Sequence, residues 1–252
     1  MTNPHGSWIW YELLTTDPDA AIDFYGRIAG WTASKFPSAE MDYNILSAGA
    51  DNVAGIMKNP MPTAPAWLGY VGVDDVDAAV AKIESLGGKV HMPATDLEGV
   101  GRMAMVEDPQ GAHFYVMRGS SPEASKAYGR RELGKASWNE LQTTDDAAAF
   151  GFYSQVFGWQ KDGAMPMPWG DYSFLKGGGG GEMWGAMMPR EKAENPVAWN
   201  FYFRVPDIDA AFAQVKELGG TPFHDPMEVP GGERLFFATD PQGAAFGLVA
   251  PK

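Results

Sequence analysis

The sequence predicts an α+β protein made of two tandem domains, each containing two βαβββ units. Three observations support this fold class: a long internal repeat, a fainter repeat inside each copy, and helical patterns that alternate with short β-like runs. The chain of 252 residues is long enough for two domains of ordinary size. Hydrophobic residues make up 45% of it, which is sufficient for a substantial core.

The long repeat is clearest in the pentamer DPQGA, which begins at Asp108 and again at Asp240. Matches are spaced 128 residues apart early in each copy and 132 later, so four residues are added to the second copy near "KGGGGGEMWG". This repeat predicts domains at residues 5–118 and 136–250, joined by a polar linker at 119–135. The other matched pairs include Glu12 with Glu140, Phe24-Tyr25 with Phe152-Tyr153, Gly30-Trp31 with Gly158-Trp159, Trp67 with Trp199, and Arg102 with Arg234.

Each copy contains a half-repeat in which an apolar run is followed by an aspartate and then by a helical pattern. In the first unit, Thr16 or Asp17 suits the N-cap position, and Pro18 suits the first helical turn. The apolar stripe of this helix is Ile22, Tyr25 and Ile28. In the second unit the stripe is Val76, Val80, Ile83 and Leu86, followed by Gly87, which suits a left-handed helix end.

Short β-like runs follow each helix, for example YNILSAG and GRMAMVEDPQGAHFYVM. They complete the βαβββ pattern four times along the chain.

Composition excludes several kinds of function. The net charge of −13 disfavours nucleic acid and anionic membrane surfaces as partners. The chain has no cysteine, which excludes disulfides, thiolate metal sites and cysteine nucleophiles. No signal-peptide pattern or membrane-spanning run is found in the sequence, so we expect a cytoplasmic protein, either monomer or homodimer, with a small-molecule partner.

The ordered motif WxELxTxD, a helix, Gly-Trp and then DPQGA occurs twice, and it resembles the vicinal oxygen chelate superfamily. This superfamily includes glyoxalase I, extradiol dioxygenases, and bleomycin and fosfomycin resistance proteins; the tandem glyoxalase-like proteins of bacteria are the most similar group. The resemblance implies two tandem vicinal-oxygen-chelate domains whose mixed sheets curl into bowls. It also implies a divalent metal in the bowl, bound by His, Glu or Gln side chains.

The resemblance assigns ligand positions that this sequence does not fill with His or carboxylate side chains. We therefore expect no metal at the usual centre, and a divalent metal with an unusual ligand set is the alternative. His5, His91 and His224 lie near termini or loops at no recurring metal spacing. The assigned positions are Trp10 and Trp138, residues around Ile56-Met57 and Ala186-Met187, Leu68 and Asn200, and Tyr115 and Gly247.

Strand alternation predicts which side chains face each bowl, because residues two apart share a face. The predicted ligand-binding residues are Trp8, Trp10, Leu68, Tyr70, Trp138, Asn200, Tyr202 and Arg204. The candidate catalytic residues are Glu12, Glu140, His113 and Tyr115. The alternative interpretation pairs the two glutamates with Arg102, Arg234 or Arg204, and makes His113 a hydrogen-bonded core residue.

These residues support two hypotheses about function. The first is metal-independent binding of a small planar or hydrophobic molecule in aromatic bowls, as in resistance by sequestration. The second is a glyoxalase-like enzyme, which is either a lyase or isomerase with Glu12 or Glu140 as base, or an enzyme with an unusual metal site. His113 and Tyr115 have Ala245 and Gly247 as counterparts, so we expect the two bowls to differ.

Overall fold

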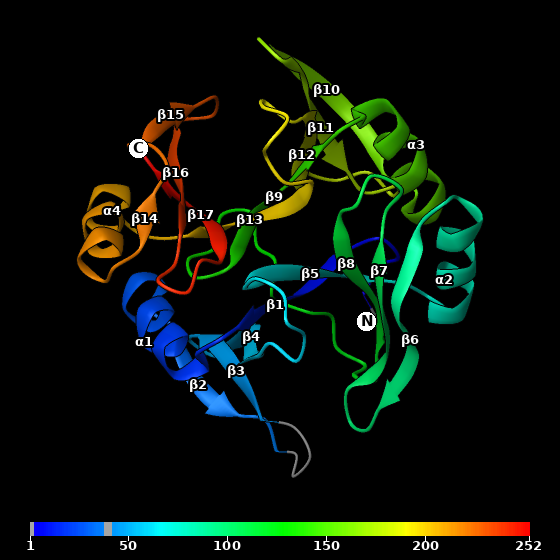
Figure 1. Ribbon diagram of the computed structural model, residues 1–252, viewed down its shortest axis with the longest axis horizontal. Helices are drawn as coiled ribbons and strands as arrows, with labels where there is room; N and C mark the ends of the chain where they lie inside the picture. The colour runs from blue at the N-terminus through cyan, green and yellow to red at the C-terminus, as the bar shows by residue number, and fades with distance from the viewer. Residues whose placement is uncertain (1–2, 38–41) are drawn as a thin grey trace. The chain divides into compact units, whose positions relative to one another are not determined.

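The computed structural model describes residues 3–37 and 42–252, and the α+β fold with two tandem domains is confirmed (Figure 1). The helices described are α1 (Pro18–Ala29), α2 (Val76–Ser85), α3 (Asp146–Phe157) and α4 (Ile208–Glu217). The first repeat has the strands β1 (Trp8–Thr15), β2 (Thr32–Lys35), β3 (Tyr43–Ala48), β4 (Asp51–Lys58), β5 (Ala66–Gly72), β6 (Lys89–Leu97), β7 (Gly101–Glu107) and β8 (His113–Gly119). The second repeat has β9 (Ala136–Thr143), β10 (Gln160–Met167), β11 (Gly170–Lys176), β12 (Gly185–Pro189), β13 (Ala198–Arg204), β14 (Thr221–Pro222), β15 (Met227–Val229), β16 (Glu233–Thr239) and β17 (Ala245–Pro251).

Every one of these helices begins after an aspartate whose side chain accepts a hydrogen bond from the backbone of the first turn. Asp17 performs this role for α1, so it is the N-cap and Thr16 is not. The helices α1 and α3 end at glycines with left-handed backbones. The predicted stripe of α1 is partly correct, because Tyr25 and Ile28 are buried but Ile22 is only half-buried.

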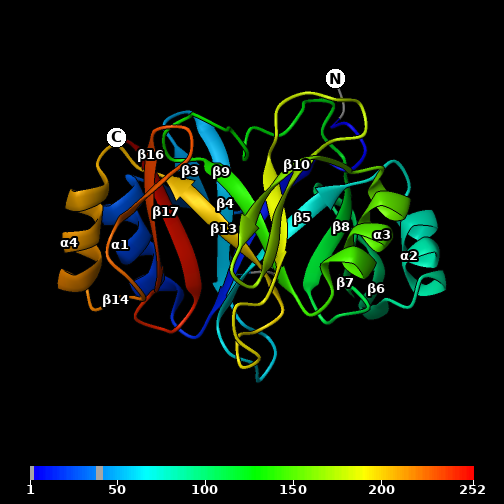
Figure 2. The same cartoon turned by 90° about the horizontal axis from the view of Figure 1, so that it is seen from above.

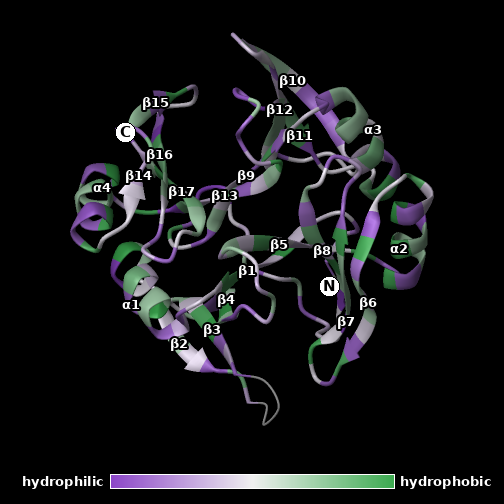
Figure 3. Cartoon of the chain, viewed as in Figure 1, coloured by the Kyte–Doolittle hydropathy of each residue, from purple (hydrophilic) through white to green (hydrophobic). Residues whose placement is uncertain are grey.

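Each repeat forms one mixed sheet, with the strand orders β2-β3-β4-β1-β5-β8-β7-β6 and β10-β11-β12-β9-β13-β17-β16-β14, and β15 pairs with β16. The pairs β1–β4, β5–β8, β9–β12 and β13–β17 are parallel, and the remaining pairs with a described register are antiparallel. Hydrophilic and hydrophobic residues alternate along strands such as β6 (Figure 3).

The backbone clusters into two compact units that divide the chain differently from the repeats. Unit 1 contains Met1–Ile9, Gly69–Ser125 and Asn139–Trp199. Unit 2 contains Trp10–Leu68, Lys126–Trp138 and Asn200–Lys252. Each unit therefore combines half of one repeat with half of the other, and α2 lies beside α3 in unit 1 as α1 lies beside α4 in unit 2 (Figures 1 and 2). The domain limits predicted from the repeat, 5–118 and 136–250, stay a prediction.

A buried chain of hydrogen bonds, which we call the first clasp, holds the two halves of unit 1 together. The indole Nε1 of Trp199 donates to the Tyr153 hydroxyl at 2.9 Å, and this hydroxyl donates to Asp108 Oδ2 at 2.9 Å. The other carboxylate oxygen, Oδ1, accepts the backbone N–H groups of residues 110, 111 and 112. Asp108 therefore closes the DPQGA turn and also binds a tyrosine of the other repeat.

Unit 2 contains the matching chain, which we call the second clasp. Trp67 Nε1 donates to the Tyr25 hydroxyl at 2.9 Å, and this hydroxyl donates to Asp240 Oδ2 at 3.0 Å. Both DPQGA turns require their glycine, because φ is 109° at Gly111 and 97° at Gly243. The motifs repeated in the sequence are thus the partners in two equivalent clasps, each of which joins both repeats.

The strands next to the clasps have one face against helices and one face away from them. In unit 1 the Phe114 ring packs against Tyr153 and Phe157 of α3. Strand alternation puts the neighbouring His113 and Tyr115 on the opposite face, which we call the helix-distal face. In unit 2, Phe246 packs against Phe24 and Tyr25 of α1, so Ala245 and Gly247 belong to the helix-distal face there.

Replacing Tyr153 by phenylalanine should lower the free energy of unfolding by about 1–3 kcal/mol, because it leaves two buried polar groups without their partner. The measurement is urea unfolding followed by circular dichroism. Tyr25→Phe in the second clasp should lower the free energy of unfolding by a similar amount. Ser85→Ala is the control for removal of a hydroxyl, since Ser85 is exposed and its hydroxyl only donates to the Lys82 carbonyl of the same helix, and it should change stability by less than about 0.5 kcal/mol. Equal losses in Tyr153→Phe and Ser85→Ala would contradict the clasp.

The clasp carboxyl groups should titrate above the ordinary range. Burial raises the pKa of Asp108 and outweighs the hydrogen bonds from Ala112 and Tyr153. A pKa raised in the folded state means that the contribution of Asp108 to stability is present below its unfolded pKa of about 3.9 and is lost as the pH rises through the folded value. Carboxyl carbon shifts followed by NMR should give a midpoint above 3.8 for Asp108 and below 3.8 for Asp77, whose pKa Arg102 lowers through a hydrogen bond. The reverse order would show that the clasp carboxylate is well solvated.

Candidate functional site

Two histidines and a glutamate meet on the helix-distal face of unit 1. Glu107 is the last residue of β7 and pairs directly with His113, the first residue of β8. His91 lies on β6, where the register with β7 shifts between Val90 and Met92. One ligating atom from each of the three side chains lies within 4.8 Å of the others.

The carboxylate of Glu107 is at the centre of this His–Glu–His cluster. Its Oε2 lies 2.7 Å from His91 Nε2 and 3.6 Å from His113 Nε2, and the two imidazole centroids are 4.6 Å apart. Its Oε1 accepts a hydrogen bond from Lys89 Nζ at 2.8 Å. The Glu107 side chain is 11% exposed, whereas the side chains of His91 and His113 are 36% and 40% exposed, so solvent reaches the cluster from the histidine side.

The surroundings favour the protonation states that metal ligands need. Burial lowers the pKa of His113, and the nearby His91 lowers it further. The Nδ1–H group of His113 donates to the Gly111 carbonyl at 3.1 Å, which leaves a lone pair on Nε2 in the neutral ring. Burial acts to raise the pKa of Glu107, but hydrogen bonds from Lys89 and His91 outweigh it and hold the pKa below its usual range.

A stacked pair of tyrosines continues the same face. Tyr70 on β5 pairs in register with Tyr115 on β8, and their rings are nearly parallel at 10° with centroids 4.2 Å apart. Tyr115 is two residues beyond His113 and shares its face. The structure therefore brings the predicted residues Tyr70, Tyr115 and His113 together.

The second repeat has none of these ligands on its matching face. At a spacing of 132 residues, His91, Glu107 and His113 correspond to Phe223, Thr239 and Ala245. Tyr115 corresponds to Gly247, where an added Cβ would lie 2.2 Å from the Tyr202 ring. The Tyr202 ring also packs against Phe237 at 5.6 Å. The two faces thus have matching strands and different side chains.

The candidate bases Glu12 and Glu140 are both buried, at 4% and 6% exposure. The Tyr172 hydroxyl donates to Glu140 Oε2 at 2.8 Å. The three arginines that were proposed as ion-pair partners bind other carboxylates: Arg102 pairs with Asp77 and Asp96, Arg234 with Asp209, and Arg204 with Glu233. A catalytic role for the two glutamates stays a prediction.

The other predicted ligand-binding residues lie in different surroundings. Trp8 is buried in a tryptophan cluster of unit 1, with centroid distances of 5.8, 5.9 and 4.8 Å to Trp159, Trp184 and Trp199. Trp10 Nε1 donates to the Tyr43 hydroxyl at 2.7 Å. Leu68, Tyr202 and Arg204 are buried, and Trp138 and Asn200 are half-buried. Their binding roles stay predictions.

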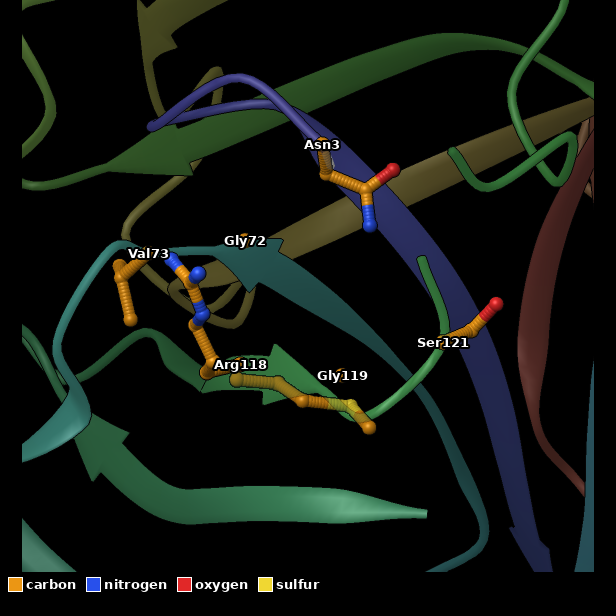
Figure 4. Close-up of a pocket in the computed structure, with 7 residues that line it drawn as sticks. Asn3, Gly72, Val73, Arg118, Gly119 and Ser121 are labelled. Carbon is orange, nitrogen blue, oxygen red and sulfur yellow. The ribbon is translucent and has the colours of Figure 1, made fainter. Parts of the chain in front are cut away.

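A small pocket in unit 1 lies at the ends of β5 and β8, away from the clustered histidines (Figure 4). Asn3 of the N-terminal segment faces Gly72, Arg118 and Ser121 across it. Its volume of about 10 Å³ is the space that one water molecule needs, so it does not suit an organic ligand.

The sequence placed His91 near a loop at no recurring metal spacing, but the structure places it on β6 beside Glu107 and His113. His91 lies sixteen residues before Glu107, and their adjacency depends on how β6 pairs with β7. The β7–β8 hairpin was the feature of the sequence that could have revealed part of the cluster, since it pairs Glu107 with His113. The cluster fits the alternative expectation of a divalent metal and not the expectation of none.

Comparisons with known proteins agree with this architecture. Residues 9–116 and 135–248 match the model of the Glyoxalase/Bleomycin resistance protein/Dioxygenase superfamily. The chain belongs to this family. The chain is 34% identical over 250 residues to "Putative glyoxylase CFP32" of Mycobacterium tuberculosis, which covers 96% of this chain and 94% of that protein.

It is also 31% identical over 268 residues to "Anthracycline biosynthesis protein DauV" of Streptomyces sp. (strain C5), covering 97% of this chain and 93% of that protein. Among solved structures, the Mn(II)-bound glyoxalase from Novosphingobium aromaticivorans superposes with a TM-score of 0.67 at 18% identity, covering 99% and 83% of the two chains. At that identity the likeness shows the fold. In the part of the chain that is described, no helix has the length and apolar character to cross a membrane.

Proposed function

We propose that this protein is a metal-assisted, glyoxalase-like protein that handles a small molecule at the helix-distal face of unit 1. The observation that carries the proposal is the His–Glu–His cluster, in which two imidazoles and one carboxylate converge. His91, Glu107 and His113 would hold a divalent cation, and Tyr70 and Tyr115 would bind a planar or hydrophobic molecule next to it.

The donor chemistry of the cluster fits such a cation. Two imidazoles and one carboxylate suit borderline divalent ions such as zinc, nickel or iron, and three ligands leave coordination positions open. A bound cation of this kind polarises an oxygen of the molecule that reaches it. His91 now donates its Nε2 proton to Glu107, so a cation bound at Nε2 requires that proton to move to Nδ1 or to leave the ring. By contrast, the positions where the family places its metal hold Trp10, Leu68 and Tyr115 in the first repeat, and these residues do not fit one.

The named relatives support a role with small molecules, since one is named as a glyoxylase and another for anthracycline biosynthesis. Tyr115 lies two residues from His113, which is about 7 Å along a strand, so a molecule at the cluster would lie beside the stacked pair, whose members Tyr70 and Tyr115 are buried at 3% and 6% exposure. Whether the molecule is converted or only bound depends on a general base, and Glu140, which is hydrogen-bonded to Tyr172, is the base that the sequence predicts in unit 1.

The second candidate function is metal-independent binding of a planar or hydrophobic molecule. The observation that favours it is the helix-distal face of the second repeat, where Tyr202, Phe223 and Phe237 form a row of aromatic rings and metal ligands are replaced. Metal binding separates the two candidates, because sequestration by stacking needs no cation.

Untagged protein stripped with EDTA should bind one equivalent of Zn²⁺ or Ni²⁺ in isothermal titration calorimetry. His113→Ala and Glu107→Gln should each weaken binding by more than about 100-fold, because loss of a second-shell partner alone costs roughly 10–100-fold. The matched control is His224→Ala, since His224 is exposed and lies outside the cluster, and it should bind as the unaltered protein does.

Failure to bind any of Zn²⁺, Ni²⁺, Fe²⁺ or Mn²⁺ would refute the proposal and leave sequestration as the better candidate. Stoichiometric binding that survives in His113→Ala would show that the cation is held by other residues. Far-UV circular dichroism of each variant checks that the fold is retained.

A further inference from the structure

Two arginines flank one glutamate in unit 2, with a third arginine next to them in the chain, at the opposite end of the helix-distal face from Phe223. Arg204 ends β13, Glu233 begins β16, and Arg130 and Arg131 lie just before β9. The Arg204 guanidinium donates to Glu233 and, through Nε, to Ser137 Oγ at 3.3 Å. Arg130 Nη1 lies 3.8 Å from the other oxygen of Glu233.

The charges of this arginine cluster do not balance. The guanidinium groups of Arg204 and Arg130 flank the single carboxylate of Glu233. The positive charge of Arg131 also acts on Arg204. Burial lowers the pKa of Arg204, and repulsion from Arg130 and then Arg131 lowers it further. A local excess of positive charge in a chain of net charge −13 is unusual, and an anion would relieve it.

The fold itself does not need these charges. The positions that match Arg204 and Glu233 in the first repeat, at a spacing of 132 residues, are Gly72 and Gly101. The same β-strands therefore form there without an ion pair. Burying Arg204, whose side chain is only 4% exposed, carries a desolvation cost that the first repeat avoids. The buried ion pair is therefore a feature of the second repeat alone.

Aromatic rings border the cluster on two sides. The Arg130 guanidinium lies 4.4 Å above the centroid of the Trp138 ring, which fixes its plane by a cation–π contact. Tyr202 is two residues before Arg204 on the same face, about 7 Å along the strand. A planar guanidinium presents paired N–H donors that match a carboxylate or phosphate group.

From this juxtaposition we infer that the second repeat binds a small molecule in which a flat ring carries an anionic group, either a carboxylate or a phosphate. The anionic group contacts Arg130 and Arg131, Arg204 supplies a fixed charge behind them, and the ring packs near Tyr202 and Trp138. This site is separate from the His–Glu–His cluster, so it goes beyond the proposed function and does not depend on it.

The test is calorimetric titration of the full chain in EDTA, at constant ionic strength, with benzoate, phenyl phosphate, inorganic phosphate and benzyl alcohol. EDTA removes any bound cation, so the outcome is independent of metal binding. We expect benzoate or phenyl phosphate to bind at one site, more tightly than benzyl alcohol or inorganic phosphate. Arg130→Gln and Arg131→Gln should each weaken that binding about tenfold, as expected for loss of one charge-assisted hydrogen bond.

The matched control is Arg27→Gln, which removes the same charge from α1 of the same unit, where Arg27 pairs with Glu217 at 3.7 Å. Arg27→Gln should bind benzoate or phenyl phosphate with the same affinity as the unaltered protein. The inference is overturned if no anion binds, if benzyl alcohol binds as tightly as benzoate, if inorganic phosphate binds as tightly as phenyl phosphate, or if both cluster variants match Arg27→Gln. Arg131 is exposed, so its variant keeps the test valid if Arg130→Gln fails to fold.

Discussion

The two buried Trp–Tyr–Asp clasps are the constraint on which the rest of the structure depends. In each clasp the tyrosine hydroxyl accepts one hydrogen bond and donates another, so three buried polar groups satisfy each other. The same aspartate closes the turn between the last two strands of its repeat. The turn that begins at Asp108 therefore puts Glu107 and His113 directly opposite each other, so two of the three residues of the His–Glu–His cluster are positioned by the clasp.

The second clasp imposes the same geometry on a different set of side chains. The turn at Asp240 pairs Thr239 with Ala245, neither of which suits a metal. The backbone geometry is thus shared by both repeats, while the functional chemistry depends on which residues occupy equal positions. At the positions of the His–Glu–His cluster, one copy has imidazole and carboxylate groups, and the other has Phe223, Thr239 and Ala245. The guanidinium groups of the second copy lie at the opposite end of its face. The copies of a duplicated fold can in this way differ in chemistry.

The sequence predicts the fold well because both copies need the clasp partners and their turns. These residues therefore appear in the sequence as matched motifs. It does not predict the compact units, since matched residues reveal equivalence and not contact: Asp108 binds Tyr153 of the other repeat and not Tyr25 of its own. His113 could be predicted to share a face with Tyr115 from strand alternation. His91 could not, because the register shift in β6 interrupts that alternation.

The two faces differ in whether the cationic side chain that balances the local glutamate can move away from it. At the His–Glu–His cluster, Lys89 balances Glu107, and its side chain is 69% exposed. A lysine so exposed can turn into solvent at little cost, which leaves the carboxylate and two imidazoles for an incoming cation. At the arginine cluster, Arg204 is buried between Ser137 and Glu233 and has no such freedom. The positive charge there is fixed, which is the reason for proposing a cation at the first face and an anion at the second, although the two faces are formed by matching β-strands.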